Sequence, residues 1–250
     1  MDKEAICLLH LNIERERHLD AVKRLLAQKH PDIFCLNEVP ESLAETLAGV
    51  LGFVFHFEPM GNYAEPDGRG TFKVGIMIAW DPSLTIIEEP RAYLYNHHVT
   101  DQVIWVANDP ASSRRVMLVV TVQKNGVPFR IGTTHFTWTP DGSASDVQRE
   151  DMKNLLSIIE KFDDEHGIVF CGDFNAPRGG EIFGMMSAQY RDNLPLTVTT
   201  TLDQELHRAA PIVLAVDNIF SSKEYSVNMN EPIFGVSDHC ALIADITRSV

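Results

Sequence analysis

The same strand–helix–strand order occurs in each half of this chain, and this repeat constrains the fold more than any single motif does. In the first half, the apolar segment 5–13 predicts a strand, and residues 18–29 predict a helix with its apolar side chains on one face. Residues 32–39 predict a second, buried strand. The first of these strands ends near Asn12 and the second near Glu38.

The second half of the chain repeats this order. Residues 127–136 predict a strand, 146–162 a helix and 167–174 another strand, and the two strands end near His135 and Asp173. Units of this kind pack their helices over a sheet, and ligands collect beyond the carboxyl ends of the strands. The repeat therefore predicts an α/β protein of two packed sheets whose polar strand ends form one shared site.

The remainder of the chain favours strands. Asn125 and Gly126 lie between two apolar runs, 115–123 and 127–136, which is a strong signal for a hairpin. Further strands are predicted at 53–58, 73–80, 84–89, 103–108, 211–220, 224–230 and 240–246, helices at 42–51 and 180–189, and loops at 59–73 and 190–211.

The composition is that of an ordinary globular protein, with 44% of the 250 residues hydrophobic and 22% charged. No linker divides the chain, so residues 1–250 are predicted to form a single domain. We expect neither a membrane span nor a secretory signal, and therefore a cytoplasmic protein. The cysteines lie in apolar runs without paired spacing, which is typical of reduced core residues: Cys7, Cys35, Cys171 and Cys240.

The charge balance bears on possible partners. The formal net charge is −14, and the Lys and Arg residues are scattered along the chain. Because tight nucleic-acid binders carry a basic footprint, we expect no extended surface for duplex nucleic acid. The composition still allows a local basic groove.

Polar residues at the predicted strand ends and near the C-terminus are the candidates for chemistry. Most of them offer oxygen donors and none is a thiol, which favours Mg²⁺, Mn²⁺ or Ca²⁺ over structural zinc. Metal sites of this kind promote in-line displacement at phosphorus. The candidates are Asn12, Glu38, His135, Asp173, Asn175, Asp217, Asp238 and His239.

Several of these residues also have a purely structural interpretation. Asn12 and Glu38 could simply end their strands, and His135 could be a core histidine with satisfied hydrogen bonds. The pair Asp173 and Asn175 is more specific, because alternation along a strand points both side chains to one face.

Asp217 follows an apolar run in which an unpaired acid would be costly to bury, and the Asp238-His239 pair supplies a histidine partner for it. The adjacent His97 and His98 would diverge on a strand, so they are a weak candidate for a metal site. The sequence contains no nucleophile elbow, zinc-protease helix or P-loop.

With these residues assembled, the chain resembles the endonuclease/exonuclease/phosphatase superfamily of deoxyribonuclease-I-like proteins. The resemblance implies a four-layered α/β sandwich, in which two packed mixed β-sheets are flanked by helices with pseudo-twofold internal symmetry. The matching motifs, in the expected order, are LNI (11–13), LNEV (36–39), TTHF (133–136), GDFN (172–175), VDNIF (216–220) and SDH (237–239).

The resemblance also implies roles for individual residues. Glu38 would be the principal ligand of Mg²⁺, with Asn12 beside it and Asp238 close to the metal. Asp173 would orient or deprotonate the attacking water, and Asn175 would hold the scissile phosphate.

His239 would contact the phosphate as a stabiliser or base, oriented by Asp217, and His135 would be a second phosphate contact or the leaving-group acid. The chain departs from the family pattern at two positions. Asn37 replaces the common Gln, and Asn218 stands where Tyr or His is frequent.

The family often places a further phosphate contact in the middle of the chain. Four residues could fill this role, and the sequence does not choose among them: Tyr63, Arg69, Lys73 and Arg115.

The resulting hypothesis is a Mg²⁺- or Mn²⁺-dependent phosphoesterase that acts on a phosphodiester or phosphomonoester, either a small molecule or a short single-stranded nucleic acid. A nuclease acting on DNA or RNA is the narrower alternative. A non-catalytic module that binds phosphoesters is the alternative from another class.

Overall fold

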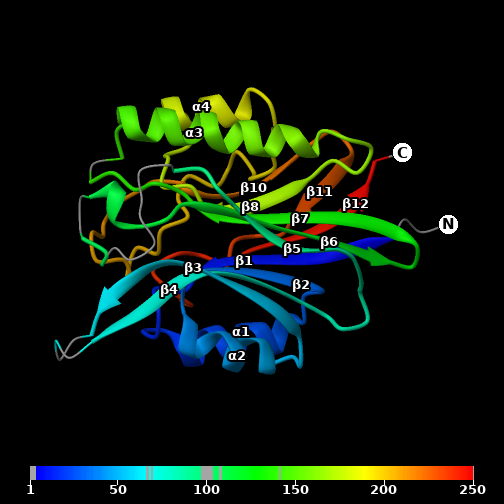
Figure 1. Cartoon of the computed structure of the whole chain (residues 1–250), viewed down its shortest axis with the longest axis horizontal. Coiled ribbons are helices and arrows are strands. Elements are labelled where there is room, and N and C mark those ends of the chain that lie inside the picture. The colour runs from blue at the N-terminus through cyan, green and yellow to red at the C-terminus, as the bar shows by residue number, and fades with distance from the viewer. Residues whose placement is uncertain are drawn as a thin grey trace.

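The computed structural model describes residues 4–65, 68, 70–96, 104–106, 109–140 and 142–249. Within them, two six-stranded sheets pack face to face with helices on both outer sides, which confirms the predicted four-layered α/β sandwich (Figure 1). Among the described residues, no helix is both long and apolar enough to cross a membrane.

The first sheet has the strand order β11-β12-β1-β2-β4-β3, and the second has the order β5-β6-β7-β8-β10-β9. The strands of the first sheet are β1 (Ala5–Asn12), β2 (Ile33–Pro40), β3 (Val54–Ala64), β4 (Thr71–Trp80), β11 (Tyr225–Met229) and β12 (Leu242–Arg248). Those of the second are β5 (Thr85–Leu94), β6 (Val116–Lys124), β7 (Val127–His135), β8 (Val169–Asp173), β9 (Arg191–Asp192) and β10 (Asp217–Ser221).

Helices α1 (Leu19–Lys29) and α2 (Glu41–Gly49) cover the first sheet, and α3 (Asp146–Ile159) and α4 (Glu181–Ser187) cover the second. Two short 3₁₀ turns, Pro110–Ser112 and Glu160–Phe162, complete the regular structure. The second of these turns forms the end of the helix predicted at 146–162.

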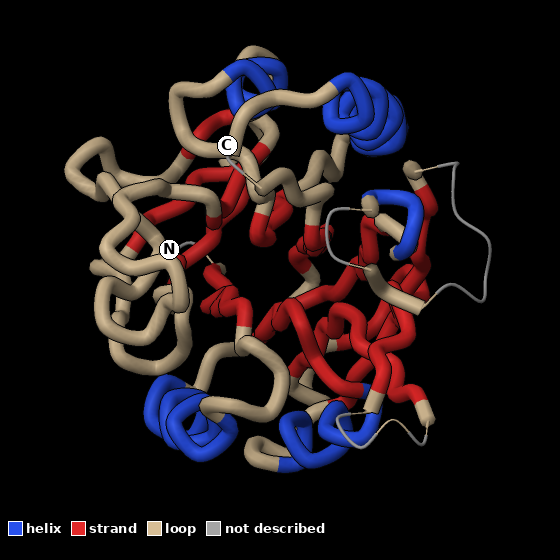
Figure 2. The backbone as a smooth tube through the Cα atoms, turned by 90° about the vertical axis from the view of Figure 1, so that its left-hand side faces the viewer, coloured by secondary structure: helices blue, strands red, loops and turns tan. Residues whose placement is uncertain are grey.

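The two sheets are built alike, as the sequence repeat predicts. In each sheet the two central strands are parallel and are joined through a helix, β1 with β2 through α1 and β7 with β8 through α3. Each central pair is flanked by antiparallel neighbours. In Figure 1, β1 runs from the N-terminus at the right toward the left, and Figure 2 views the molecule from that left side, with strands in the middle and helices toward the rim.

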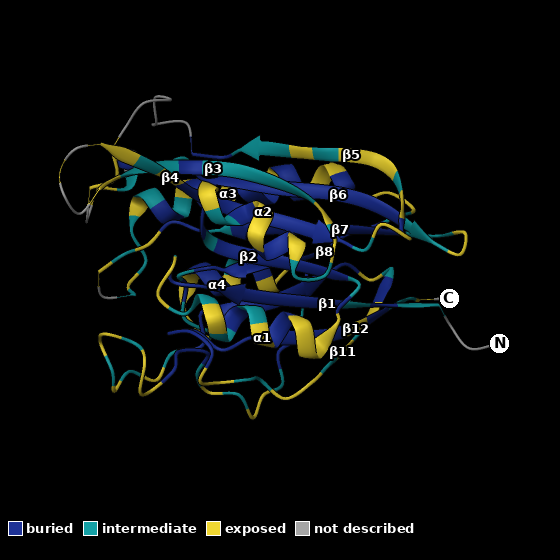
Figure 3. Cartoon of the chain, turned by 90° about the horizontal axis from the view of Figure 1, so that it is seen from below, coloured by how far each residue is buried: buried dark blue, intermediate teal, exposed yellow. Residues whose placement is uncertain are grey.

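Alternation along each strand sorts the apolar side chains into three cores. On β1, Ile6 and Leu8 belong to the core between the sheets, whereas Leu9 and Leu11 pack in the core under α1 and α2. Figure 3 shows mostly buried strands and helices with exposed outer faces.

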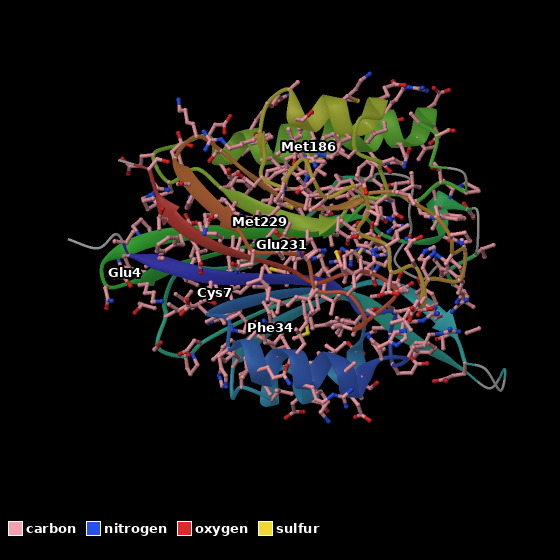
Figure 4. The ribbon with its side chains drawn as sticks, turned by 180° about the vertical axis from the view of Figure 1, so that it is seen from behind. Glu4, Cys7, Phe34, Met186, Met229 and Glu231 are labelled. Carbon is pink, nitrogen blue, oxygen red and sulfur yellow. The ribbon has the colours of Figure 1, made fainter. Side chains whose placement is uncertain are left out.

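The two outer cores lie on opposite sides of the molecule. Figure 4 marks them with Phe34, beside α1 and α2, and Met186, in α4. The alternation leaves every second side chain of the central strands facing the other sheet, so polar residues at the strand ends are directed toward the space between the sheets.

Two predicted strands differ from the described structure, and the strand predicted at 211–220 forms only from Asp217, as β10. Residues 211–216 form no strand because their backbone bonds to loops: the carbonyls of Leu214, Ala215 and Val216 accept from Thr201, Arg178 and Phe174, respectively. Within 103–108, the described residues 104–106 make only an isolated bridge, at Ile104.

Two further expectations concern a loop and the cysteines. The loop predicted at 59–73 is shorter, because β3 and β4 continue into it as far as Ala64 and from Thr71. All of the cysteines are free, and all except the partly exposed Cys7 are buried.

Candidate active site

Three polar residues stand side by side across the second sheet. His135 at the end of β7 pairs with Asp173 at the end of β8, and Asp173 pairs with Asp217 at the start of β10. They continue the strand faces that Ile131 and Cys171 present to the core between the sheets. Their side chains therefore lie at one edge of the apolar core between the two sheets.

The first sheet meets this row through two asparagines. Asn12 at the end of β1 is in register with Asn37, and the two form the last pair of the parallel ladder between β1 and β2. The Nδ2 of Asn12 donates to Oδ2 of Asp173 at 3.1 Å, and the backbone N–H of Asp173 donates to Oδ1 of Asn37 at 2.9 Å. Asn37, one of the departures from the family pattern, thus ties the two sheets together at Asp173.

Glu38 reaches the site through an irregularity in β2. The pairing of β2 with β4 shifts its register between Leu36 and Val39, and Glu38 between them has a left-handed backbone with φ of 55°. A β-bulge of this kind turns a side chain away from its regular direction. Burial, together with the nearby charge of Asp238, raises the pKa of Glu38 above its ordinary value.

Left-handed backbone conformations gather around this site. Besides Glu38, the non-glycine residues Glu14, Arg15 and Asn175 have φ values of 48°, 63° and 48°, and all four line the same cleft. Such conformations cost about 1–3 kcal/mol each and cluster at functional sites.

The placement of Asn175 has a different cause from the one predicted. β8 ends at Asp173, so the left-handed turn, rather than continued alternation, brings Asn175 to the cleft. Its Nδ2 donates to the carbonyl oxygen of Phe136 at 3.0 Å. Phe174, which lies between Asp173 and Asn175 in the sequence, is fully buried in the core under α3 and α4.

Asp217 has the histidine partner that its burial predicts, and a second one that the sequence did not indicate. Its Oδ2 lies 2.8 Å from Nδ1 of His239, and its Oδ1 lies 3.2 Å from Nε2 of His10. His10 is fully buried on β1, two residues before Asn12. The available signal was alternation, because a histidine two positions before a polar strand end faces the same side.

The charges in this row change the acidity of its members. Burial alone would raise the pKa of Asp217, but His239 and His10 hold it well below its ordinary value. Burial likewise opposes the charge on His239, yet Asp217 and Asp173 raise the pKa of that ring well above its ordinary value. His239 is therefore a buried cation held between two carboxylates.

The pKa values of Asp173 and His135 are shifted in directions that favour proton transfer. Burial, which outweighs the stabilising charge of His239, raises the pKa of Asp173 to about 6. Burial and the positive charge of Arg115 hold the pKa of His135 well below its ordinary value, so this ring is neutral. The Oδ2 of Asp173 lies 3.4 Å from Nε2 of His135 and 3.8 Å from Nε2 of His239.

These groups open onto one cleft of about 360 Å³. The candidates that line it are Glu38, His135, Asp173, Asn175, Asp238 and His239. The other two candidates, Asn12 and Asp217, are each only 1% exposed and support the lining residues from beneath. The cleft thus brings together residues spread over most of the chain.

The proposed mid-chain phosphate contacts fall into different places. Tyr63 and Arg115 line the cleft, whereas Lys73 lies on the surface in an ion pair with Glu41 at 3.2 Å. Arg69 lies outside the described residues, as do His97 and His98. The Nη1 of Arg115 donates to the carbonyl oxygen of His135 at 3.1 Å, and its buried Nε has no hydrogen-bond partner in the described part of the chain.

Two loops add charged residues that sequence reasoning missed. Glu14 and Arg15 follow β1, and His207 and Arg208 belong to the loop before residue 211; all four line the cleft. Arg208 pairs with Glu14 at 3.1 Å, which joins the two loops across the cleft edge. The run of charges directly after the LNI motif was the available signal for Glu14 and Arg15.

The residues present fit a hard divalent cation. Glu38 and Asp238 line the cleft, and burial raises the pKa of both. A cation between these carboxylates would relieve their mutual repulsion. Asn12 turns Nδ2 toward Glu38 at 3.4 Å while its Oδ1 accepts from the Glu14 amide, so the two acids offer the free oxygen ligands.

Two further groups of side chains bring potential ligand atoms within 4.8 Å of one another: Asp173, Asp217 and His239, and His207, Asp238 and His239. In the first group, Asp217 already bonds both of its histidines. In the second, Nδ1 of His207 accepts from the backbone N–H of Ala209 at 3.2 Å, which leaves Nε2 as the protonated nitrogen. Neither group offers as free a set of oxygens as Glu38 and Asp238.

Solved structures of low sequence identity share this fold. The endonuclease/exonuclease/phosphatase from Bacteroides vulgatus is 15% identical with a TM-score of 0.71, and the match covers 99% of this chain and 100% of that one. The catalytic domain of human Nocturnin with bound sulfate is 17% identical with a TM-score of 0.68, covering 99% and 97%. ANGEL2, a 2′,3′-cyclic phosphatase in complex with adenosine-2′,3′-vanadate, is 14% identical with a TM-score of 0.71, covering 100% and 97%.

Among curated protein sequences, none matches this chain. The profile of the Endonuclease/Exonuclease/phosphatase family, in contrast, matches residues 9–239 and so includes every candidate residue of the cleft and the row beneath it. The chain belongs to the Endonuclease/Exonuclease/phosphatase family.

Proposed function

We propose that this protein is a phosphoesterase that depends on Mg²⁺ or Mn²⁺ and attacks phosphorus with a water oriented by Asp173. The observation that carries the proposal is the position of Asp173, a carboxylate with a raised pKa placed between two imidazoles at the floor of one cleft. A base whose pKa lies near the working pH combines the required ionised form with a useful driving force for proton transfer.

The surrounding side chains have complementary roles. The protonated ring of His239 would stabilise charge on the phosphate, and Asp217 holds that ring through Nδ1. The neutral His135 and the amide of Asn175 would contact the phosphate oxygens, and Arg115 would add a fixed positive charge beside them. Preorganised donors of this kind supply much of the rate enhancement of an enzyme.

The bonds and protons of the proposed reaction balance. The water oxygen bonds to phosphorus while Asp173 takes its proton, and the bond between phosphorus and the leaving oxygen breaks. The leaving oxygen takes a proton from solvent, and Asp173 later returns its proton to solvent, so His239 keeps the charge that stabilises the phosphate. Glu38 and Asp238 would hold the divalent cation, with Asn12 beside them, and the cation would supply Lewis-acid stabilisation of the phosphate charge.

The class of substrate is a phosphoester small enough to enter the cleft, either a small molecule or a short single-stranded nucleic acid. Nocturnin with bound sulfate and ANGEL2 with adenosine-2′,3′-vanadate support the expectation that a cleft of this fold takes tetrahedral or phosphate-like anions. We also propose that residues 1–250 act as a single domain, since the cleft takes residues from both sheets.

A screen of phosphodiesters and phosphomonoesters with Mg²⁺, with Mn²⁺ and with a chelator tests this proposal. We expect hydrolysis that the chelator abolishes, and a fall in kcat of about 10²–10⁴-fold in Asp173→Ala and His239→Ala. Lys73→Met is the matched control, because Lys73 lies outside the cleft. Turnover at the wild-type level in Asp173→Ala would contradict the proposed role, and tight phosphate binding without turnover of any substrate would favour a binding module.

A further inference from the structure

Two aromatic rings and a guanidinium form a stack on one wall of the cleft. The rings of Tyr63 and Trp105 lie 5.0 Å apart between centroids and only 10° from parallel. The guanidinium of Arg15 lies over the Tyr63 ring at 5.4 Å from its centroid. All three residues line the cleft that contains Asp173.

The stack is held in place by backbone contacts. The N–H of Trp105 donates to the carbonyl oxygen of Asn62 at 2.7 Å, and Asn62 also forms a β-bridge with Ile104. The N–H of Val106 donates to Oγ of Ser112 at 2.9 Å. A surface fixed before a ligand arrives loses less conformational entropy on binding.

The stack lies close to the reacting groups. Burial raises the pKa of the Tyr63 phenol to about 12, and the charges of Glu38, Arg115 and Arg15 act on that pKa as well. Trp105 is 37% exposed, so its ring offers open apolar surface in the same cleft as Asp173. A group bound on Trp105 would share the cleft with the scissile phosphate, on the side of Tyr63.

The chemistry of this wall favours a flat, π-rich group over an acyl chain. Parallel aromatic rings and a stacked guanidinium present planar faces, on which a nucleobase stacks favourably. An acyl chain would require an apolar trough, whereas Glu14, Arg15 and Arg208 give this cleft a charged edge. The scattered positive charge fits one or a few nucleotides rather than a duplex.

We propose that Arg15, Tyr63 and Trp105 form a base-stacking subsite, and that the substrate is a phosphoester with a nucleobase next to the scissile phosphate, namely a nucleotide or the end of a single strand. This inference rests on the phosphoesterase function proposed above. Trp105 supplies the open face, and Tyr63 with Arg15 supports it from behind.

The test compares two substrates that differ only in the base. One is a short single-stranded oligonucleotide, and the other carries an abasic sugar at the position next to the cleaved phosphate. In Trp105→Ala and Tyr63→Ala, we expect the ratio of kcat/KM for the base-bearing over the abasic substrate to fall about tenfold or more. Trp105→Phe should keep most of this ratio, and Leu196→Ala, which changes an exposed apolar side chain outside the cleft, should keep all of it.

A binding measurement separates this inference from the proposed function. In Asp173→Asn, which should lack turnover, we expect a nucleoside monophosphate to bind more tightly than ribose phosphate, and Trp105→Ala should remove that difference. If the wild-type protein hydrolyses no phosphoester, the proposed function fails while this measurement still decides on the subsite.

Two results would overturn the subsite. One is an equal loss of binding or turnover for the base-bearing and abasic ligands. The other is binding of phosphatidylcholine vesicles that Trp105→Ala abolishes, which would assign the exposed rings to a lipid surface instead.

Discussion

β1 and β2 in the first half of the chain, and β7 and β8 in the second, form the same parallel pair, but they end on different side chains. The second pair ends on an imidazole and a carboxylate, His135 and Asp173, which are suited to moving protons. The first pair ends on two amides, and its acid, Glu38, reaches the cleft only through a bulge. In the proposed function, one framework would thus supply proton chemistry from one half and a cation ligand from the other.

A buried group of charged residues beneath the cleft connects the two halves. Asp217 extends the row of the second sheet and bonds His239, while it also reaches across to His10 of the first sheet. The two halves are therefore joined by a buried ion-pair chain whose members cannot be separated without exposing a charge to an apolar core.

Breaking that chain should produce the largest effect. Asp217→Ala leaves His10 and His239 without their shared partner, so we expect a loss of about 3–5 kcal/mol in the free energy of unfolding. Chemical denaturation followed by circular dichroism measures this loss. A change below about 1 kcal/mol would show that Asp217 does not hold the halves together in this way.

Replacing the acid of the first half should act on the cation. Glu38→Gln keeps the size of the side chain but removes its charge, and we expect weaker Mn²⁺ binding by about tenfold to a hundredfold in calorimetry. Glu41→Gln is the matched control, since Glu41 pairs with Lys73 outside the cleft. Unchanged Mn²⁺ affinity in Glu38→Gln would contradict the proposal that the first half of the chain supplies the cation ligand.

Loosening the tie between the sheets should have a smaller effect. Asn37→Ala removes the acceptor of the buried Asp173 amide, which should cost about 1–3 kcal/mol of stability and lower kcat as Asp173 shifts. Asn218→Ala removes a partly buried side-chain hydrogen bond, from Nδ2 of Asn218 to Oδ1 of Asp192 at 2.8 Å, on the other face of the second sheet. Equal effects of the two variants on kcat would contradict a special role for Asn37.

The smallest effect on stability is expected from the ion pairs at the starts of β2 and β8, away from the cleft. Asp32 before β2 pairs with Lys124 at 2.9 Å, and Asp164 before β8 pairs with Arg130 at 2.8 Å. Burial opposes ionisation of Asp164, but Arg130 holds its pKa below the ordinary value of 3.8. This ion pair therefore contributes stability above pH 3.8 and loses it as the pH falls through the lowered pKa.

At neutral pH we expect Asp164→Asn to cost at most about 1 kcal/mol, because the pair is exposed to solvent on one side. The difference from the wild-type protein should vanish in acid, as measured by denaturation at several pH values. A difference that grows as the pH falls would reverse the assigned sign.

The sequence predicted most of the residues that the structure brings together in the candidate site, because the relevant information is local. Apolar runs ending in Asn12, Glu38, His135 and Asp173 mark strand ends, and the parallel order of the units places those ends at one edge. The predicted pairing of Asp217 with His239 followed from the cost of burying an unpaired acid. The strand predicted at 211–220 was wrong in its first part, 211–216, because an apolar run does not reveal whether its backbone will bond to a strand or to loops.

The sequence by itself determined the layered fold, the order of the elements and the strand ends that meet, because alternation and helical periodicity are properties of neighbouring residues. Only the tertiary structure decided that His10 bonds Asp217, that a bulge directs Glu38 into the cleft, and that Arg15, Tyr63 and Trp105 stack on its wall. These features depend on the register between strands and on loops that are distant in the chain. A one-residue change in register reverses the face that a side chain occupies.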